Sequence, residues 1–225
     1  MELTSIRAAW LQQLQQHRAI AVIRAPSLDL GYSVAAAAAA GGMRLLEVSW
    51  TTPSAAQLIE KLRADFPHCQ IGAGTLLSED VLHRAVDAGA QFLFSPHTSA
   101  ALIQAACRRQ RPMVPGALSP SEAVAAWQAG ASSVKIFPVS TMGGAAYIHA
   151  LRGPLGHIPL VPTGGVTLEL APALLAAGAV AVGLSTALFP KAALEAADWD
   201  AIAQGAAALT TRIEGYMSRK PLGHD

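Results

Sequence analysis

A chain of 225 residues, of which 52% are hydrophobic and only 14% charged, has the length of one α/β domain with a large buried core. Its formal net charge of +1, without a run of basic residues, argues against a nucleic-acid surface. The low charged fraction fits strands covered on both faces and a surface partly buried by self-association, so we expect a homo-oligomer.

The first predicted element is an amphipathic helix over residues 3–17. Its scattered polar residues do not form the uninterrupted apolar segment of a signal peptide, so we expect a cytoplasmic protein. Cys69 and Cys107 lie far apart and lack the spacing of a metal site. They are therefore expected to be reduced thiols, as is usual in the cytoplasm.

Apolar runs then alternate with helical segments along the chain. Several runs begin after an Ala-Gly pair, where glycine is favoured because it tolerates the left-handed conformation just past a helix end. Short apolar runs bounded by Gly or Pro are typical of strands. We predict eight strands within residues 19–26, 40–48, 70–75, 88–95, 111–117, 129–137, 158–165 and 177–185.

Start signals mark several of the intervening helices. Residues 119–122, Ser-Pro-Ser-Glu, form a capping box with proline at the first helical position. Simpler versions of the signal occur at residues 52–53 and 78–79. The alanine run at residues 35–40 is expected to be the packed face of another helix.

Residues 170–190 carry no charge and are long enough for a membrane span. Prolines, glycines and hydroxyl residues interrupt them, so a helix followed by a buried strand explains the stretch better, and we expect no membrane segment. A closing helix is predicted near residues 197–218. The alternation predicts one domain over residues 1–225, a (β/α)₈ TIM barrel with an extra N-terminal helix. A doubly wound sheet is the alternative.

In a barrel the active site lies at the carboxyl ends of the strands, where isolated polar residues are costly to bury without a role. Lys135 occurs in the apolar run Val-Lys-Ile-Phe-Pro. Burial favours a neutral amine, which can attack a ketone. The alternatives are a lysine that reaches the solvent at the rim or pairs with a carboxylate.

Glu47, in Leu-Leu-Glu-Val, is the acid within a strand-like run. On the second strand it would face the sixth strand, which carries Lys135, across a ring of eight. One carboxyl group can serve as both acid and base in imine chemistry. A salt bridge across the barrel is the alternative.

Small and hydroxyl residues follow the last two predicted strands: Thr163, Gly164 and Gly165 after the seventh, Gly183 and Ser185 on the eighth. Glycines let backbone N–H groups approach a ligand, and these two loops are the usual phosphate site of a barrel. We predict a phosphate site here, although a Gly-Gly pair by itself is also an ordinary turn.

Two further candidates lie at the ends of other strands. Thr75, in Gly-Ala-Gly-Thr, is placed to donate a hydrogen bond to a carboxylate or oxyanion, or else to cap a helix. Arg24 ends the first strand. It is either a counter-charge for an anionic substrate or part of a salt bridge at the rim.

These motifs, in this order and spacing, closely resemble the 2-keto-3-deoxy-6-phosphogluconate (KDPG) and 4-hydroxy-2-oxoglutarate (KHG) aldolases. The resemblance covers about residues 21–188. It implies a class I aldolase that needs no metal or other cofactor, acts on a small phosphorylated keto acid, and commonly forms a trimer. The motifs are LLEV (45–48), GAGT (72–75), SP (95–96), VPG (114–116), VKIFP (134–138), PTGG (162–165) and GLS (183–185).

The resemblance also implies roles for the site residues. Lys135 would attack the C2 ketone, and Glu47 would move protons while the C3–C4 bond breaks. Pyruvate and glyceraldehyde 3-phosphate would be the products. Thr75 would bind the pyruvate carboxylate and Thr163 would line the pocket. Phosphate would be held by Gly164, Gly165 and Ser185.

One position departs from the family pattern. Some members carry an arginine four residues after the catalytic glutamate, where it binds the pyruvate carboxylate, and this chain has Thr51 there. We hypothesise that Arg24 supplies the missing charge. Related 6-phosphogalactonate aldolases also have an arginine at the end of the first strand, so the galacto substrate is an alternative. The rival functions are an isomerase or epimerase and a barrel that only binds a phosphorylated metabolite.

Overall fold

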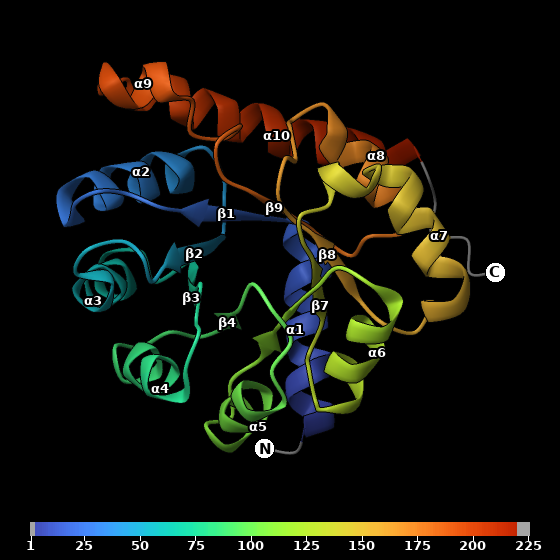
Figure 1. Ribbon diagram of the computed structural model, residues 1–225. Helices are drawn as coiled ribbons and strands as arrows, with labels where there is room; N and C mark the ends of the chain where they lie inside the picture. Colours follow the sequence, from blue (N-terminus) through green and yellow to red (C-terminus); the bar gives the residue numbers. More distant parts are fainter. Residues whose placement is uncertain (1–2, 220–225) are drawn as a thin grey trace.

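Parallel strands alternate with helices in the computed structural model, which describes residues 3–219 (Figure 1). The ends of the predicted domain, residues 1–2 and 220–225, lie outside the described residues. The helices are α1 (Leu3–His17), α2 (Leu28–Ala40), α3 (Ala55–Asp65), α4 (Glu79–Asp87), α5 (Ala100–Arg108), α6 (Pro120–Gln128), η1 (Ser140–Met142, a 3₁₀ turn), α7 (Ala145–Leu155), α8 (Leu170–Ala176), α9 (Lys191–Glu195) and α10 (Trp199–Arg219). The strands are β1 (Ala19–Ile23), β2 (Leu45–Ser49), β3 (Gln70–Gly74), β4 (Leu93–Phe94), β5 (Met113–Val114), β6 (Gly116–Ala117), β7 (Val134–Ile136), β8 (Leu160–Pro162) and β9 (Val182–Leu184).

The strands pair in parallel within two sheets, in the orders β5-β4-β3-β2-β1-β9 and β6-β7-β8. Only Pro115 separates β5 from β6, and proline has no N–H to donate to a ladder. At the other border, Thr163 and Gly183 form a parallel bridge between the end of β8 and β9. The predicted parallel α/β fold is confirmed, with a curled sheet and helices around its outer side (Figure 1). Complete closure into a barrel stays a prediction.

Serine caps explain where several helices begin. The hydroxyls of Ser78 and Ser119 accept backbone N–H groups of the first turn, and the predicted capping box between Ser119 and Glu122 is present. The start predicted at residues 52–53 is wrong by two residues. Helix α3 begins at Ala55, because the hydroxyl of Thr52 is engaged elsewhere, as acceptor of the Ala25 N–H at 3.2 Å.

Small residues let the outer helices approach closely. Four alanines of the run in α2 form its packed face, as predicted: Ala35, Ala37, Ala38 and Ala39 are buried. At its end, a Cβ on Gly41 would lie 2.3 Å from the carbonyl oxygen of Ala203 on α10, so glycine is required for this contact. The closing helix, α10, begins two residues later than predicted, after the separate short helix α9.

Residues 170–190 contain helix α8 and strand β9, as predicted. Among the described residues, no helix is long and apolar enough to cross a membrane.

Cys69 and Cys107 are free thiols, the first buried and the second half-buried.

Helix α1 packs across the amino-terminal ends of the strands. Its Trp10 ring lies 5.0 Å from the ring of Phe92 and 6.4 Å from that of Phe94, measured between centroids. The indole N–H donates to Ser133 Oγ at 3.0 Å. This end of the strands is therefore covered by a fixed aromatic cluster, and the carboxyl ends are left to form the predicted site.

Candidate active site

A cavity of about 490 Å³ opens at the carboxyl ends of the strands. Strands β1, β7, β8 and β9 and the loops that follow them supply most of its wall. The structure therefore brings together residues that lie far apart in the sequence. The predicted site residues that line the cavity are Arg24, Thr75, Lys135, Thr163, Gly164, Gly165, Gly183 and Ser185.

Lys135 lies in the middle of β7 and is only 7% exposed. Its Nζ is 4.8 Å from the ring centroid of Phe137 and 5.9 Å from that of Phe94. Among the ion pairs of residues 3–219, none includes Lys135. The lysine thus neither reaches the rim nor pairs with a carboxylate. Its amine is held against aromatic rings and faces the cavity.

Glu47 is the predicted site residue that does not line the cavity, and it lies against Gly74, the residue before Thr75 in the cavity wall. The side chain is 1% exposed, and in the described part of the chain its Oε2 has no hydrogen-bond partner. A Cβ on Gly74 would lie 1.7 Å from Glu47 Oε1, so the glycine of β3 makes room for the carboxyl group. A buried carboxyl oxygen without a protein partner is available to a bound ligand.

Burial raises the pKa of Glu47, and the positive charges of Lys135 and Arg24 lower it in part. Desolvation is the larger effect, because it penalises the ionised carboxylate. A glutamate with a raised pKa holds a proton more readily near neutral pH, as a group that must act as both acid and base requires. Lys135 and Arg24 are thus close enough to affect the pKa of Glu47, although neither forms an ion pair with it among the described residues.

Arg24 follows β1 and lines the cavity from an exposed position. The salt bridge considered for it at the rim is not among the ion pairs of the described residues. Its guanidinium group is therefore available to an anion in the cavity.

Thr75 has φ of +61°, in the left-handed region that β-branched residues rarely adopt. It does not cap a helix, because Ser78 caps α4. Its Oγ1 shares a hydrogen bond of 2.9 Å with Ser49 Oγ, which also contacts Thr51 Oγ1 at 2.8 Å. Backbone strain of this kind often marks a functional position.

Ser49 was not among the predicted site residues. It is completely buried and lies two residues after Glu47 on β2, so both side chains point to the same face of the sheet. Its position two residues after Glu47 was the signal in the sequence that could have identified Ser49 as a site residue. The hydroxyl of Ser49 ties the end of β2 to Thr75 after β3 and so orients the threonine.

The predicted phosphate loops meet at the far side of the cavity. Gly164 and Gly165 have φ of +87° and +73°, and a Cβ on Gly165 would lie 2.1 Å from Ser140 Oγ. A Cβ on Gly183 would lie 2.6 Å from Thr163 Oγ1. Glycine is therefore required for both the turn and the close contact between the loops.

Sequence reasoning also missed Phe137 and Thr186, which line the same cavity. Phe137 lies over Gly164, since a Cβ there would be 2.9 Å from its ring. In the sequence it belongs to the strand motif Val-Lys-Ile-Phe-Pro, which gives no sign of a role in the site. In the structure its partly exposed ring forms a wall beside Lys135.

Comparison with known sequences gives one consistent result. The family model described as "Aldolase: KDPG and KHG aldolase" matches residues 11–205. The 2-dehydro-3-deoxy-phosphogluconate aldolase of Pseudomonas aeruginosa is 37% identical over 167 residues, 74% of this chain and 76% of that protein. The KHG/KDPG aldolase of Escherichia coli is 34% identical over 183 residues, 81% of this chain and 86% of that protein.

Solved structures are similar over most of their length. A KDPG aldolase from Legionella pneumophila, with pyruvate captured as a covalent carbinolamine intermediate, has a TM-score of 0.81 at 30% identity, covering 93% of this chain and 98% of that one. A native KDPGal structure has a TM-score of 0.79 at 28% identity, with 89% and 96% covered. A protein cage designed by fusing symmetric oligomeric domains has a TM-score of 0.80 at 28% identity, with 90% and 74% covered.

Proposed function

The chain belongs to the KDPG and KHG aldolase family, and we propose that it cleaves KDPG to pyruvate and glyceraldehyde 3-phosphate as a class I aldolase. The observation that carries this proposal is the buried Lys135 in a cavity wall, without an ion pair among the described residues and close enough to Glu47 for its charge to lower the pKa of that carboxyl group in part. The reaction is that of an aldehyde-lyase.

In the first half of the proposed mechanism, the neutral amine of Lys135 adds to the C2 carbonyl and forms a carbinolamine. Glu47 in its acid form protonates the departing hydroxyl, and water leaves as the iminium forms. The raised pKa of Glu47 supports this role, because a proton must be present on the carboxyl group at neutral pH. The resulting carboxylate is then ready to act as the base.

In the second half, Glu47 removes the proton of the C4 hydroxyl, directly or through water. The C3–C4 electron pair moves to the iminium nitrogen, and glyceraldehyde 3-phosphate leaves. Protonation of the enamine at C3 restores an iminium of pyruvate on Lys135. Hydrolysis then releases pyruvate and regenerates the amine.

The carboxylate of the keto acid would be held by Thr75 and Arg24. This chain has Thr51 where some family members have the carboxylate-binding arginine. Two features support the replacement: Arg24 is unpaired in the described structure and lines the cavity, and Ser49 fixes the hydroxyl of the strained Thr75. The hydroxyl groups of Ser49 and Thr51, which share a hydrogen bond, lie near the end of β2 and carry no charge.

The phosphate would lie between the loops after β8 and β9, on backbone N–H groups of Gly164 and Gly165 and the hydroxyl of Ser185. Gly183 would allow the close approach of the two loops, and Thr163 would line the pocket beside the carbon chain. The shared bridge between Thr163 and Gly183 supports this placement, because it holds both loops at one level.

The same site could accept the galacto epimer of KDPG, which differs at C4, or 4-hydroxy-2-oxoglutarate, which lacks the phosphate. The Escherichia coli relative is named for KHG and KDPG, and one similar structure is named for KDPGal. We favour KDPG because relatives at 34–37% identity carry that name. Comparing kcat/KM for the three compounds tests this choice.

We also propose that residues 1–225 form one closed (β/α)₈ barrel and that three chains assemble into a homotrimer. The continuity of β5 and β6 through Pro115 and the bridge between Thr163 and Gly183 support closure. The similarity to a domain used for its symmetric oligomer supports assembly. Sedimentation equilibrium, which measures mass in solution, tests the trimer.

The reaction class is tested by adding borohydride together with pyruvate. Reduction of an imine should inactivate the enzyme and leave a mass adduct on Lys135, whereas the exposed Lys191 should remain unmodified. An isomerase or epimerase, or a protein that only binds phosphorylated metabolites, would form no adduct. Survival of full activity after this treatment would refute the Schiff-base mechanism.

A further inference from the structure

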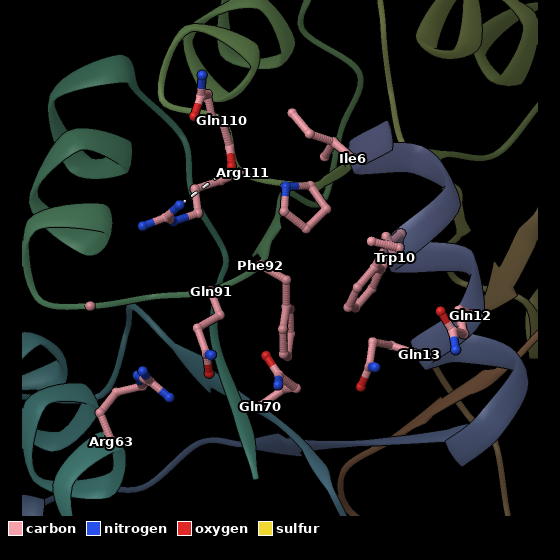
Figure 2. A pocket seen from close by; sticks show the side chains of 13 residues that line it. Ile6, Trp10, Gln12, Gln13, Arg63, Gln70, Gln91, Phe92, Gln110 and Arg111 are labelled. Atoms are coloured by element: carbon pink, nitrogen blue, oxygen red, sulfur yellow. Dashed lines mark hydrogen bonds between the residues drawn. The ribbon is translucent and has the colours of Figure 1, made fainter. Parts of the chain in front are cut away.

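A second cavity, of about 530 Å³, lies at the opposite end of the strands (Figure 2). Helix α1 forms one side of it. The other side consists of the start of β3 and the segments that lead into β4 and β5. No step of the proposed reaction uses this cavity, and no residue of the candidate active site lines it.

Two arginines line this cavity, and no acidic residue is among the residues that form it. Arg63 lies in the last turn of α3, and its side chain passes over Gly89, where a Cβ would lie 3.5 Å from Arg63 Cγ. Arg111 donates from Nε to Ala90 O at 3.1 Å and from Nη1 to Gln110 O at 3.3 Å. The two hydrogen bonds hold the Arg111 side chain at the cavity, and neither arginine is neutralised by these contacts.

Three other arginines of the protein are paired with acidic side chains. Arg108, Arg109 and Arg212 pair with carboxylates on the surface. Within residues 3–219, neither Arg63 nor Arg111 takes part in an ion pair. Two guanidinium groups at one cavity without a carboxylate form a binding surface for an anion, because each presents several N–H donors.

Glutamines surround the same space, and Figure 2 shows Gln13, Gln70 and Gln91 around the ring of Phe92. Gln91 Oε1 accepts the Ile71 N–H at 2.9 Å, which fixes the side chain and leaves its amide NH₂ as a donor. An amide offers donors and an acceptor together, which matches hydroxyl groups that do the same.

The wall formed by Trp10 and Phe92 completes the cavity. Both rings are buried in the core and stack at 5.0 Å, and the indole N–H is already used by Ser133. This side therefore offers apolar contact and no further donor. Small-molecule sites typically combine such an apolar wall with a few convergent polar groups in a volume of about 300–1,000 Å³.

We propose that this cavity is a second binding site, for a small organic anion whose carbon chain carries several hydroxyl groups. The carboxylate or phosphate of the ligand binds Arg63 and Arg111, its hydroxyls bind the amides of Gln70 and Gln91, and its C–H groups lie against Trp10. Since the site lies at the far end of the strands from Lys135, its ligand binds independently of the keto acid.

Isothermal titration calorimetry with three probes tests the proposal: gluconate for a carboxylate, glucose 6-phosphate for a phosphate, and glucose as the neutral control. The variant is Arg63→Gln/Arg111→Gln, and the matched control Arg108→Gln/Arg212→Gln removes two positive charges elsewhere. We expect at least one anion to bind the wild type and control equally and the cavity variant about tenfold or more weakly. Glucose should bind none of them, and the tighter anion identifies the charged group.

Any binding of these anions at the candidate active site occurs equally in the wild type, the cavity variant and the control. It therefore does not contribute to the difference in affinity between them. If both double variants bind the anions like the wild type, or if no anion binds the wild type, the proposal is wrong. It is also wrong if sedimentation shows that the cavity variant dissociates an oligomer, because the cavity would then be an interface between chains.

A second pair of variants covers the case in which the arginine variant does not fold. Gln70→Glu places a negative charge in the cavity with almost no change in shape, and Gln16→Glu places it on the exposed side of α1. Anion binding should weaken about fivefold or more for Gln70→Glu alone. Equal affinities for these two variants would overturn the site.

Discussion

The two ends of the strands carry cavities of similar size but opposite character. At the carboxyl end two charged groups are buried, Lys135 with 7% and Glu47 with 1% of the residue exposed, while Arg24 is exposed. At the amino end Arg63 and Arg111 are half-buried, and Arg111 donates hydrogen bonds to backbone carbonyls. A buried charge is costly, and burial accordingly raises the pKa of Glu47. Under the two proposals above, the chemistry therefore depends on the buried Lys135 and Glu47, and anion binding depends on arginines that remain accessible to solvent.

The largest effect is expected from Lys135→Met, which keeps the volume of the side chain but removes the amine. Cleavage of KDPG, followed through pyruvate release, should fall by about 10⁴-fold or more, because no covalent intermediate can form. Lys191→Met, at an exposed lysine that pairs with Glu195, is the control and should keep the wild-type rate. Substantial cleavage by Lys135→Met would show that the reaction does not depend on the buried amine of Lys135.

Glu47→Gln should lower kcat by about 10²–10⁴-fold, since a neutral amide cannot exchange the proton. The trapped adduct on Lys135 should still form, more slowly, because the nucleophile is intact. Gly74→Ala provides a second measurement, as its Cβ would displace the carboxyl group by steric contact. If Glu47→Gln kept the wild-type kcat, the proton carrier would have to be another group.

Ser185→Glu should act on the phosphate and not on the chemistry. Like charges in contact cost several kcal/mol, so kcat/KM for KDPG should fall about 10²-fold. The value for 4-hydroxy-2-oxoglutarate, which has no phosphate, should change far less. Equal losses for both substrates would mean that the phosphate site is misplaced.

Arg24→Ala should raise the KM for pyruvate in an exchange assay by about 10-fold or more, as expected for loss of a hydrogen bond to a charged group. Ser49→Ala, which frees the hydroxyl of Thr75, should raise it about 3- to 10-fold with little change in kcat. Arg212→Gln is the control for removal of a positive charge. An unchanged KM in Arg24→Ala would show that another group binds the carboxylate.

The smallest effect concerns stability. Burial raises the pKa of Glu47 above its ordinary value of 4.5 in the folded state, so the folded protein binds this proton more tightly than the unfolded chain. That stabilisation is present below the ordinary pKa and is lost as pH rises through the raised one. The Glu47→Gln variant has no titratable group at this position, so it does not show this loss of stability at higher pH. The Tm of the variant relative to the wild type should therefore rise as the pH is raised above the ordinary value of 4.5. A Tm difference that is independent of pH would contradict the raised pKa.

The amino-acid sequence alone predicted the order of strands and helices and the residues at the carboxyl ends. This was possible because the signals are local: glycine past a helix end, apolar runs, and the capping box at Ser119. Isolated polar residues in such runs, above all Lys135 and Glu47, were visible for the same reason. The start of α3 was placed wrongly because Thr52 bonds across the loop to Ala25, a contact that no local pattern encodes.

Only the tertiary structure decided which of these residues contact one another. The room that Gly74 leaves for Glu47, the hydrogen bond between Ser49 and Thr75 and the left-handed Thr75 all depend on the register of neighbouring strands. The amino-terminal cavity depends on where α1 crosses the ends of several strands, so its arginines and glutamines are scattered over the chain. Local propensity determines where a strand begins and ends, whereas packing between distant segments determines what its side chains meet.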